Sequence, residues 1–141
     1  MSNRRNIMAD KLMLEVVTPQ KAIVSEEVQS VVAPGSEGEF GVLKGHTTFL
    51  TSLNMGALRY TDASGKERVL FVNGGFAEVL PDKVTILAES AERRKNIDLS
   101  RAEDAKARAE KRLSDKSDGM DMVRAEAALK RAIFRINIKN T

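Results

Sequence analysis

The sequence predicts an all-β domain, an antiparallel sandwich or barrel, followed by a hairpin of two α-helices. Short runs of β-branched and aromatic residues recur roughly every eight to twelve residues in the first part of the chain. All nine glycines except Gly119, and all three prolines, lie before residue 82. The later residues are rich in Ala, Arg, Lys, Glu and Asp, and the two compositions meet near Ala91–Asn96. We therefore expect an N-terminal extension (1–9), a β domain (10–92) and a helical domain (93–141).

The candidate strands are short and are separated by turn residues. Lys11–Thr18 has Leu12, Leu14 and Val16 at alternate positions, and Pro19 ends it because proline cannot donate to a ladder. The other candidates are Ala22–Ser25, Val28–Ala33, Phe40–Leu43, Thr47–Leu53, Ala57–Thr61, Arg68–Asn73, Gly75–Leu80 and Lys83–Ala88. No helical segment separates them, which disfavours a parallel sheet.

Two helices are predicted after the β domain. Asp98 or Ser100 caps the first, and Ser100 with Glu103 fits a capping box. Asp118 or Asp121 caps the second helix, and the polar segment Ser114–Gly119 forms the turn. The first apolar stripe is Leu99, Ala102, Ala105, Ala109 and Leu113, and the second is Met122, Ala125, Leu129, Ala132, Ile133 and Ile136. Because alanine buries little area, we expect weak, reversible packing of these helices.

The formal net charge of +3 is confined to the helical part. Residues 1–95 carry 12 basic and 12 acidic side chains, whereas residues 96–141 carry 11 basic and 8 acidic ones. Guanidinium groups suit phosphate oxygens. Arg101 and Arg108 share one face of the first helix, and the second has Arg124, Arg131 and Arg135 on one face. The alternative is a solvated charged face with the ion pairs Asp98–Arg101 and Asp104–Arg108. Without interleaved aromatic residues, a nucleic-acid site is disfavoured.

Composition excludes several classes of function. The chain has no cysteine, so disulfides, cysteine zinc sites and thiol catalysis are absent. The one histidine, His46, lacks the nucleophile and orienting acid of a catalytic constellation. The segment Gly35–Gly41 lacks the Lys-Ser/Thr ending of a phosphate loop, and its two carboxylates would repel phosphate. The longest apolar runs are too short to span a bilayer. We expect a soluble intracellular protein that is not an enzyme and requires no metal or cofactor.

Several segments together resemble the ε subunit of bacterial F-type ATP synthase. The run Val32–His46 is similar to the signature loop of that family, with Lys44 where the family often carries proline. The agreement continues through Gly56–Tyr60, Val72–Phe76 and the helical part, and covers roughly Leu12–Asn137. The resemblance implies a β-sandwich of about ten antiparallel strands followed by a two-helix antiparallel hairpin.

The resemblance also implies a function in the central stalk of a proton-translocating synthase. The sandwich would bind the γ subunit and rest on the c-ring, with Glu37, Glu39 and His46 on the c-ring side. The helical domain would change between a compact hairpin and an extended form that reaches the α/β catalytic head and inhibits ATP hydrolysis. Such a subunit is peripheral, at the cytoplasmic face of the bacterial inner membrane, and is not inserted into it.

Some bacterial members of this family have a regulatory ATP site with the pattern Ile-Asp-x-x-Arg-Ala. Here this pattern begins at Ile97 and ends at Ala102. The resemblance implies that Glu92, Ile97 and Asp98 bind the adenine and ribose of ATP, and that the arginines bind its phosphates. The full set is Glu92, Ile97, Asp98, Arg101, Ala102, Arg108, Arg131 and Arg135. ATP would then stabilise the compact hairpin. The alternative function is a free-standing nucleotide- or nucleic-acid-binding regulatory module.

Overall fold

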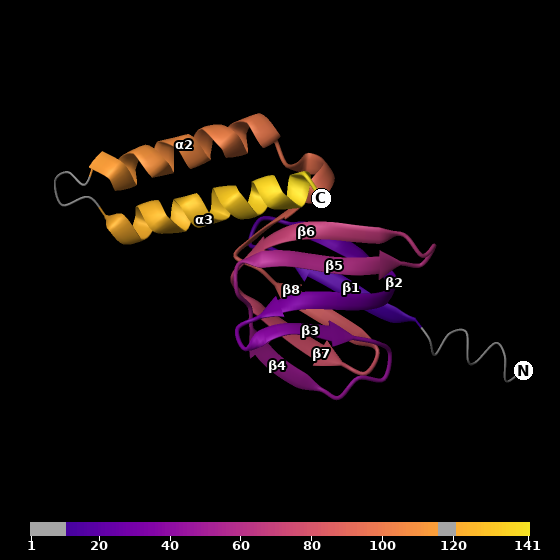
Figure 1. Cartoon of the computed structure of the whole chain (residues 1–141). Helices are drawn as coiled ribbons and strands as arrows, with labels where there is room; N and C mark the ends of the chain where they lie inside the picture. The colour runs from indigo at the N-terminus through magenta and orange to yellow at the C-terminus, as the bar shows by residue number, and fades with distance from the viewer. Residues whose placement is uncertain (1–10, 116–120) are drawn as a thin grey trace, which may run out of the picture. The chain divides into compact units, whose positions relative to one another are not determined.

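The computed structural model describes residues 11–115 and 121–141. The chain divides after Arg93 into two compact units, which are described separately below. The first unit is the predicted β-sandwich, and the second contains the two predicted helices (Figure 1).

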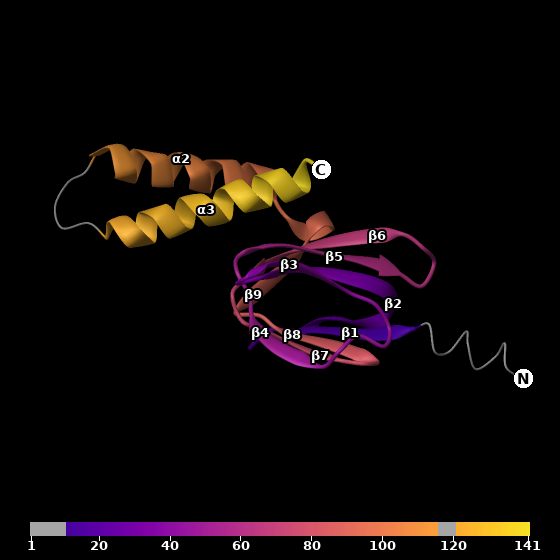
Figure 2. The same ribbon diagram turned by 60° about the horizontal axis from the view of Figure 1, so that its bottom comes forward.

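The described part of the first unit contains nine strands. They are β1 (Leu12–Val17), β2 (Ala22–Gly35), β3 (Gly38–Val42), β4 (Phe49–Ser52), β5 (Gly56–Asp62), β6 (Glu67–Asn73), β7 (Phe76–Leu80), β8 (Lys83–Leu87) and β9 (Ser90–Arg93). Hydrogen bonding links them in the order β4-β7-β8-β1-β2-β5-β6-β9, and β3 also pairs with β2. Figure 2 shows β5 and β6 in one layer and β1, β7 and β8 in the other.

The long strand β2 joins the two layers of the sandwich. The N-terminal half of β2 pairs with β1, and the C-terminal half pairs with β3 and β5. The pairing register with β5 shifts between Val28 and Ser30, where an irregularity lets the strand bend. The two predicted runs Ala22–Ser25 and Val28–Ala33 are therefore parts of one strand, because the charged pair between them, Glu26-Glu27, continues the ladder with β1.

Two further features differ from the sequence-based expectation. β1 pairs with β8 in parallel. Two parallel strands need a long connection between them, and here strands β2 to β7 provide it. β9 was not predicted, since its sequence Ser-Ala-Glu-Arg has no apolar alternation. It lies at the end of the strand order, where its main chain pairs with β6.

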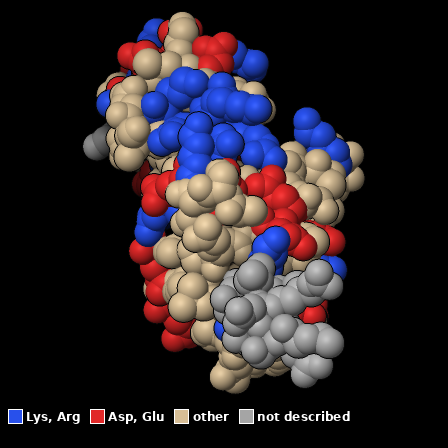
Figure 3. Space-filling view, turned by 90° about the vertical axis from the view of Figure 1, so that its right-hand side faces the viewer, with Lys and Arg blue, Asp and Glu red and all other residues tan. Residues whose placement is uncertain are grey.

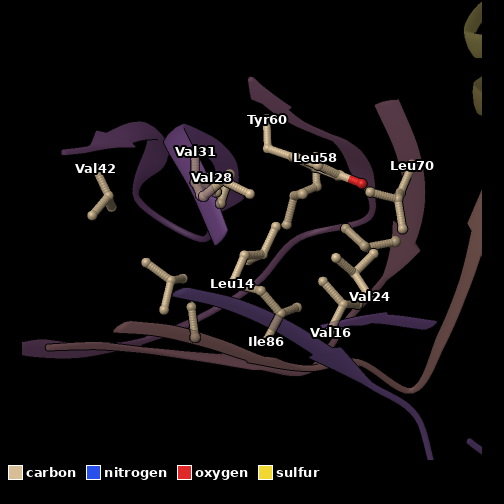
Figure 4. Packing of buried hydrophobic residues seen from close by; sticks show 14 of the residues in the cluster. Leu14, Val16, Val24, Val28, Val31, Val42, Leu58, Tyr60, Leu70 and Ile86 are labelled. Carbon is tan, nitrogen blue, oxygen red and sulfur yellow. The ribbon is translucent and has the colours of Figure 1, made fainter. Parts of the chain in front are cut away.

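The core lies between the layers. Leu12, Leu14 and Val16 of β1 are fully buried, which confirms the alternation predicted for this segment. Figure 4 shows side chains of β1 and β8 pointing toward Leu58 and Tyr60 of β5. Full burial of each such aliphatic side chain contributes about 1.5–3 kcal/mol. All buried members of this core lie between Leu12 and Ala88, so the sandwich is built from its own residues.

One turn of the sandwich requires glycine. Gly75, immediately before β7, has a φ of +105°. A Cβ atom at this position would lie 1.9 Å from the carbonyl oxygen of Leu87. No side chain fits there, so close approach of the chain beside β8 depends on Gly75.

The second unit consists of η1 (Arg94–Asn96), α2 (Leu99–Asp115) and α3 (Met122–Lys139). Asp98 caps α2 by accepting a hydrogen bond from the main-chain N–H of Arg101 at 3.1 Å. Ser100 lies inside the helix, so the alternative capping box is wrong. Asp121 caps α3 in the same way through Arg124, and the alternative cap, Asp118, lies outside the described residues.

The helices pack side by side through small residues (Figures 1 and 2). Four alanines of the predicted stripes are buried, Ala102 and Ala109 in α2 and Ala125 and Ala132 in α3. Ile133, which was also predicted on the buried stripe, is 38% exposed. The packing is therefore alanine-rich, as the sequence predicts.

Candidate functional sites

The start of the helical unit contains the pattern Ile97–Ala102. Ile97 and Ala102 are buried, whereas Asp98 and Arg101 are exposed. One oxygen of the Asp98 carboxylate is used as the cap of α2, which fixes its side chain at the helix N-terminus. The second oxygen of Asp98 accepts no hydrogen bond from the described residues. This oxygen could accept one from a ligand hydroxyl or amine.

The predicted arginines lie on both helices of the unit. Arg101 and Arg108 are exposed on α2, while Arg131 and Arg135 are half-buried on α3. The expected ion pairs Asp98–Arg101 and Asp104–Arg108 are not formed among the described residues. A solvated charged face does not depend on these particular pairs, so the arrangement of the arginines fits both a solvated face and an anion site.

One residue of the predicted nucleotide-binding set, Glu92, belongs to the sandwich unit. Glu92 is a half-buried residue of β9, and it lies opposite Phe71 of β6 in the ladder. The structure therefore distributes the predicted set over both units, with Glu92 in the first and the other residues in the second.

Two of the predicted c-ring residues, Glu37 and His46, lie in connections between strands, and the third, Glu39, lies in β3. Glu37 is exposed in the turn between β2 and β3. Glu39 forms an ion pair with Arg59, with 3.1 Å between Oε2 and Nη1. The ring of His46 lies 5.3 Å from that of Phe49, and His46 Nδ1 is 2.9 Å from the carbonyl oxygen of Thr47. His46 therefore makes its contacts with nearby residues of the chain, whereas the Glu39 carboxylate already has a cationic partner.

The described residues show neither a metal site nor a membrane span. No group of three or more His, Asp or Glu side chains within 11–115 and 121–141 could hold a metal ion. Over the same residues, neither helix combines the length and apolar character needed to cross a membrane.

Comparison with known proteins identifies both units. Residues 11–94 match the family described as ATP synthase, Delta/Epsilon chain, beta-sandwich domain. Residues 95–140 match the accompanying long alpha-helix domain. The chain belongs to the ATP synthase delta/epsilon chain family. The predicted resemblance to bacterial ε subunits is thereby confirmed.

Two relatives of this delta/epsilon family member are named ATP synthase epsilon chain. The ATP synthase epsilon chain of Desulforapulum autotrophicum is 69% identical over 134 residues, which cover 95% of this chain and 99% of the relative. The epsilon chain of Nitratidesulfovibrio vulgaris strain DP4 is 53% identical, covering 94% and 98%.

Solved structures show the same fold. A chain in the cryo-EM structure of the Euglena gracilis mitochondrial ATP synthase, OSCP/F1/c-ring, has a TM-score of 0.77 and 28% identity. That match covers 91% of this chain and 79% of the Euglena chain. A chain in the central stalk/c-ring structure from Tetrahymena thermophila shares the fold with a TM-score of 0.51 and 16% identity, covering 92% of this chain and 94% of that chain.

An apolar surface of this family member was missed by the sequence analysis. Three large apolar side chains of the sandwich are exposed: Leu50 of β4 by 69%, Phe76 of β7 by 54% and Leu87 of β8 by 54%. Strand β7 pairs with both β4 and β8. Beside Phe76 and Leu87 is a mainly apolar hollow of about 400 Å³. Its lining residues are Val17, Thr18, Pro19, Gly75, Phe76, Leu87, Ala88 and Glu89. We call Leu50, Phe76 and Leu87 the apolar patch. Their alternation with Ala77 and Ile86, both buried, could have indicated a second apolar face.

Arg93 is a second residue that the sequence analysis missed. Its guanidinium donates to the Tyr60 hydroxyl at 3.2 Å and to the carbonyl oxygen of Ile23 at 3.0 Å. Burial raises the pKa of Tyr60, and the nearby Arg93 opposes that rise. Arg93 thus ties β9 to β5 and β2, and fixes the last residue of the sandwich unit.

Asp62 organises the turn between β5 and β6. Its Oδ1 accepts hydrogen bonds from the hydroxyl and N–H of Ser64 at 2.6 and 3.0 Å and from the N–H of Lys66 at 2.9 Å. Its Oδ2 accepts from Arg68 Nε at 3.1 Å. Hydrogen bonds from Ser64 and Lys66, with a further one from Arg68, hold the pKa of Asp62 well below its ordinary value. The turn between β5 and β6 is therefore stabilised by an ionised carboxylate.

Proposed function

We propose that this chain is the non-catalytic ε subunit in the central stalk of a proton-translocating F-type ATP synthase. The observation that carries the proposal is the match of both units to the family, with a 69% identical epsilon chain over almost its entire length. This membership favours a synthase subunit over a free-standing nucleotide- or nucleic-acid-binding module.

The proposed partners are the γ subunit, the c-ring and the α/β catalytic head. In support, the Euglena structure with 28% identity contains F1 and the c-ring. We assign γ to the apolar patch, because exposed apolar side chains grouped on one sheet face are typical of a protein interface. The segments with Glu37, Glu39 and His46 would face the c-ring. A subunit held in this way is peripheral, at the cytoplasmic face of the inner membrane.

The helical unit is proposed to regulate ATP hydrolysis. Its two helices pack through alanines, which bury little area, so a modest difference in free energy separates a closed hairpin from an open one. The open form would reach the catalytic head and inhibit hydrolysis. The excess positive charge of this unit suits acidic loops there.

ATP is proposed as the regulatory ligand of the closed hairpin. The guanidinium groups of Arg101, Arg108 and Arg131 form no ion pair with the described residues, and therefore remain available to phosphate oxygens. Asp98 would accept a hydrogen bond from the ribose or the adenine amine. A ligand that binds the closed form alone stabilises it by mass action.

Co-purification from membranes tests the subunit assignment. We expect an affinity-tagged chain to retain γ, and the variant Phe76→Ser to lose most of it because a central apolar contact is removed. Val123→Ser is the matched control, since Val123 is an exposed apolar residue of α3 outside the patch. Absence of γ from the parent preparation would exclude the central-stalk assignment. Equal retention of γ by Phe76→Ser would exclude the patch alone.

A further inference from the structure

The end of α3 and the short helix η1 exchange contacts between cations and main-chain carbonyls. Lys139 Nζ donates to the carbonyl oxygens of Arg94 and Lys95 at 3.2 and 3.3 Å. In the opposite direction, Arg94 Nη1 donates to the carbonyl oxygen of Thr141 at 3.4 Å. We call these contacts the η1–α3 clasp. They join residues more than 40 positions apart in sequence, and all of them lie within the helical unit.

The chemistry of the clasp fits its position. The last carbonyl groups of a helical turn have no partner within the helix and carry partial negative charge. Lys139 supplies an ammonium to two carbonyls of η1, that of Lys95 and that of Arg94, which also accepts from the N–H of Ile97 at 3.2 Å. A hydrogen bond with a charged donor is stronger than a neutral one. Figure 3 shows Lys and Arg side chains gathered over the end of the helical unit where η1 and the C-terminus of α3 lie.

The clasp closes the end of the hairpin that covalent connection leaves open. Residues 116–120 connect α2 to α3 in the chain, so the opposite ends of the helices are joined only by non-covalent contacts. The interface between the helices is made largely of alanine, which contributes little area per residue. Ile138, the buried residue next to Lys139, lies at this end as well, and the charge-assisted bonds of the clasp add to what opposes separation there.

The residue that precedes the clasp in the chain is held in place by hydrogen bonds. Arg93, the residue before η1, is held in the sandwich by its bonds to Tyr60 and Ile23. The bonds of the clasp therefore hold the C-terminal end of α3 to the first residues of the helical unit. We propose that the η1–α3 clasp is the latch that keeps the α2–α3 hairpin closed. This inference rests on the proposed function, in which the hairpin opens.

The positive charges along α3 affect how stable the closed hairpin is. Arg131, Arg135 and Lys139 follow one another at four-residue steps, so they lie on one face of the helix. All three are half-buried. Like charges at this spacing destabilise the helix slightly. Less repulsion along this face would therefore stabilise α3, whereas removing the Lys139 donors would release the clasp.

Distance measurement on the full chain without nucleotide tests the latch. The chain has no cysteine, so Glu103→Cys in α2 and Ile133→Cys in α3 provide two unique spin-label positions for pulsed electron paramagnetic resonance. The parent is expected to show a dominant short distance and a minor long one. Lys139→Met removes the donors and keeps the length of the side chain. It should raise the ratio of open to closed hairpin roughly ten-fold, and Lys139→Arg should leave the ratio near that of the parent.

Lys130→Met is the matched control, because Lys130 is an exposed lysine of the same helix. Arg94→Met removes the reciprocal bond and should also raise the ratio, which keeps the test valid if Lys139→Met fails to fold. Two distance populations with an unchanged ratio in both clasp variants would overturn the latch and leave the mobile hairpin standing. An equal rise in Lys130→Met would overturn it as a general effect of charge. A single short distance in every variant would overturn both the latch and the proposed opening.

Discussion

The arginines of the helical unit differ in their exposure to solvent. Arg101 and Arg108 are exposed, whereas Arg131 is half-buried. An exposed charge is screened by water and salt, so its interaction with a ligand is weaker than that of a partly buried charge. Among the arginines without an ion pair to the described residues, Arg131 is therefore the one expected to contribute most to a bound phosphate.

We predict that ATP raises the melting temperature of the parent and that Arg131→Ala removes most of the rise. A ligand at ten times its Kd stabilises the folded state by about 1.4 kcal/mol, which corresponds to a shift of a few degrees. Scanning calorimetry with and without millimolar ATP measures it. Arg112→Ala, at another exposed arginine of α2, is the control. An undiminished rise in Arg131→Ala would place this side chain outside the site.

Asp62 predicts a pH dependence of the sandwich. Because its pKa is lowered in the folded state, its contribution to stability is fully present above the ordinary pKa of an aspartate. The contribution declines as the pH falls below about 4. We expect Asp62→Asn to lower the melting temperature by several degrees at pH 7 and by much less at about pH 2, because the contribution is lost only as the pH falls through the lowered pKa. Thermal unfolding followed by circular dichroism at both pH values tests this.

The control for this pH dependence is Asp82→Asn. Asp82 is an exposed turn residue of the same unit whose side chain forms no hydrogen bond or ion pair with the described residues. It should show little change at either pH. A penalty for Asp62→Asn that is equal at both pH values would contradict the role of the ionised carboxylate.

At the scale of elements, the α2–α3 interface depends on small side chains. Ala132 is 1% exposed, and a larger residue there must push the helices apart. We predict that Ala132→Leu destabilises the helical unit by about 1–3 kcal/mol, the usual cost of overpacking. Ala107→Leu, at an exposed position of α2, should have little effect. Amide hydrogen exchange in α2 and α3 measures the difference, and equal protection in both variants would show that the alanine packing is not tight.

The elements also show which sequence signals were sufficient. The apolar alternation of Lys11–Thr18 predicted β1 because one face of that strand is buried completely. Periodicity and the Asp121 cap likewise predicted α3. β9 had no such signal, since an edge strand can form through main-chain hydrogen bonds alone. Ser100 was ambiguous as a cap because Asp98, two residues earlier, competes for the same helix N-terminus.

At the scale of the whole molecule, the sandwich should be independent of the helical unit. Every buried residue of its core precedes residue 89, and Arg93 completes the last strand. We predict that a chain ending at Arg93 melts cooperatively, with a transition close to that of the sandwich in the full chain. Circular dichroism in the β region measures it. A broad transition without cooperativity would show that the sandwich needs the helical unit.

The candidate sites were predictable to different degrees. The family pattern Ile97–Ala102 and the arginine spacing could be read directly, because helical periodicity places such residues on known faces. The apolar patch and the clasp could not be predicted from the sequence. Each depends on residues from separate elements, such as Leu50 with Phe76 or Arg94 with Lys139, that the ladder or the helix packing brings together.

The sequence by itself determined the two-part organisation, the position of most strands and both helices, the confinement of net positive charge to the helical part, and the family. These properties follow from local composition, from periodicity and from continuous motifs. Only the tertiary structure decided the parallel pairing of β1 with β8, the continuity of β2, the ion pair of Glu39 with Arg59 and the hydrogen bonds of Arg93 and Lys139. These features depend on contacts between distant segments, which no local pattern specifies.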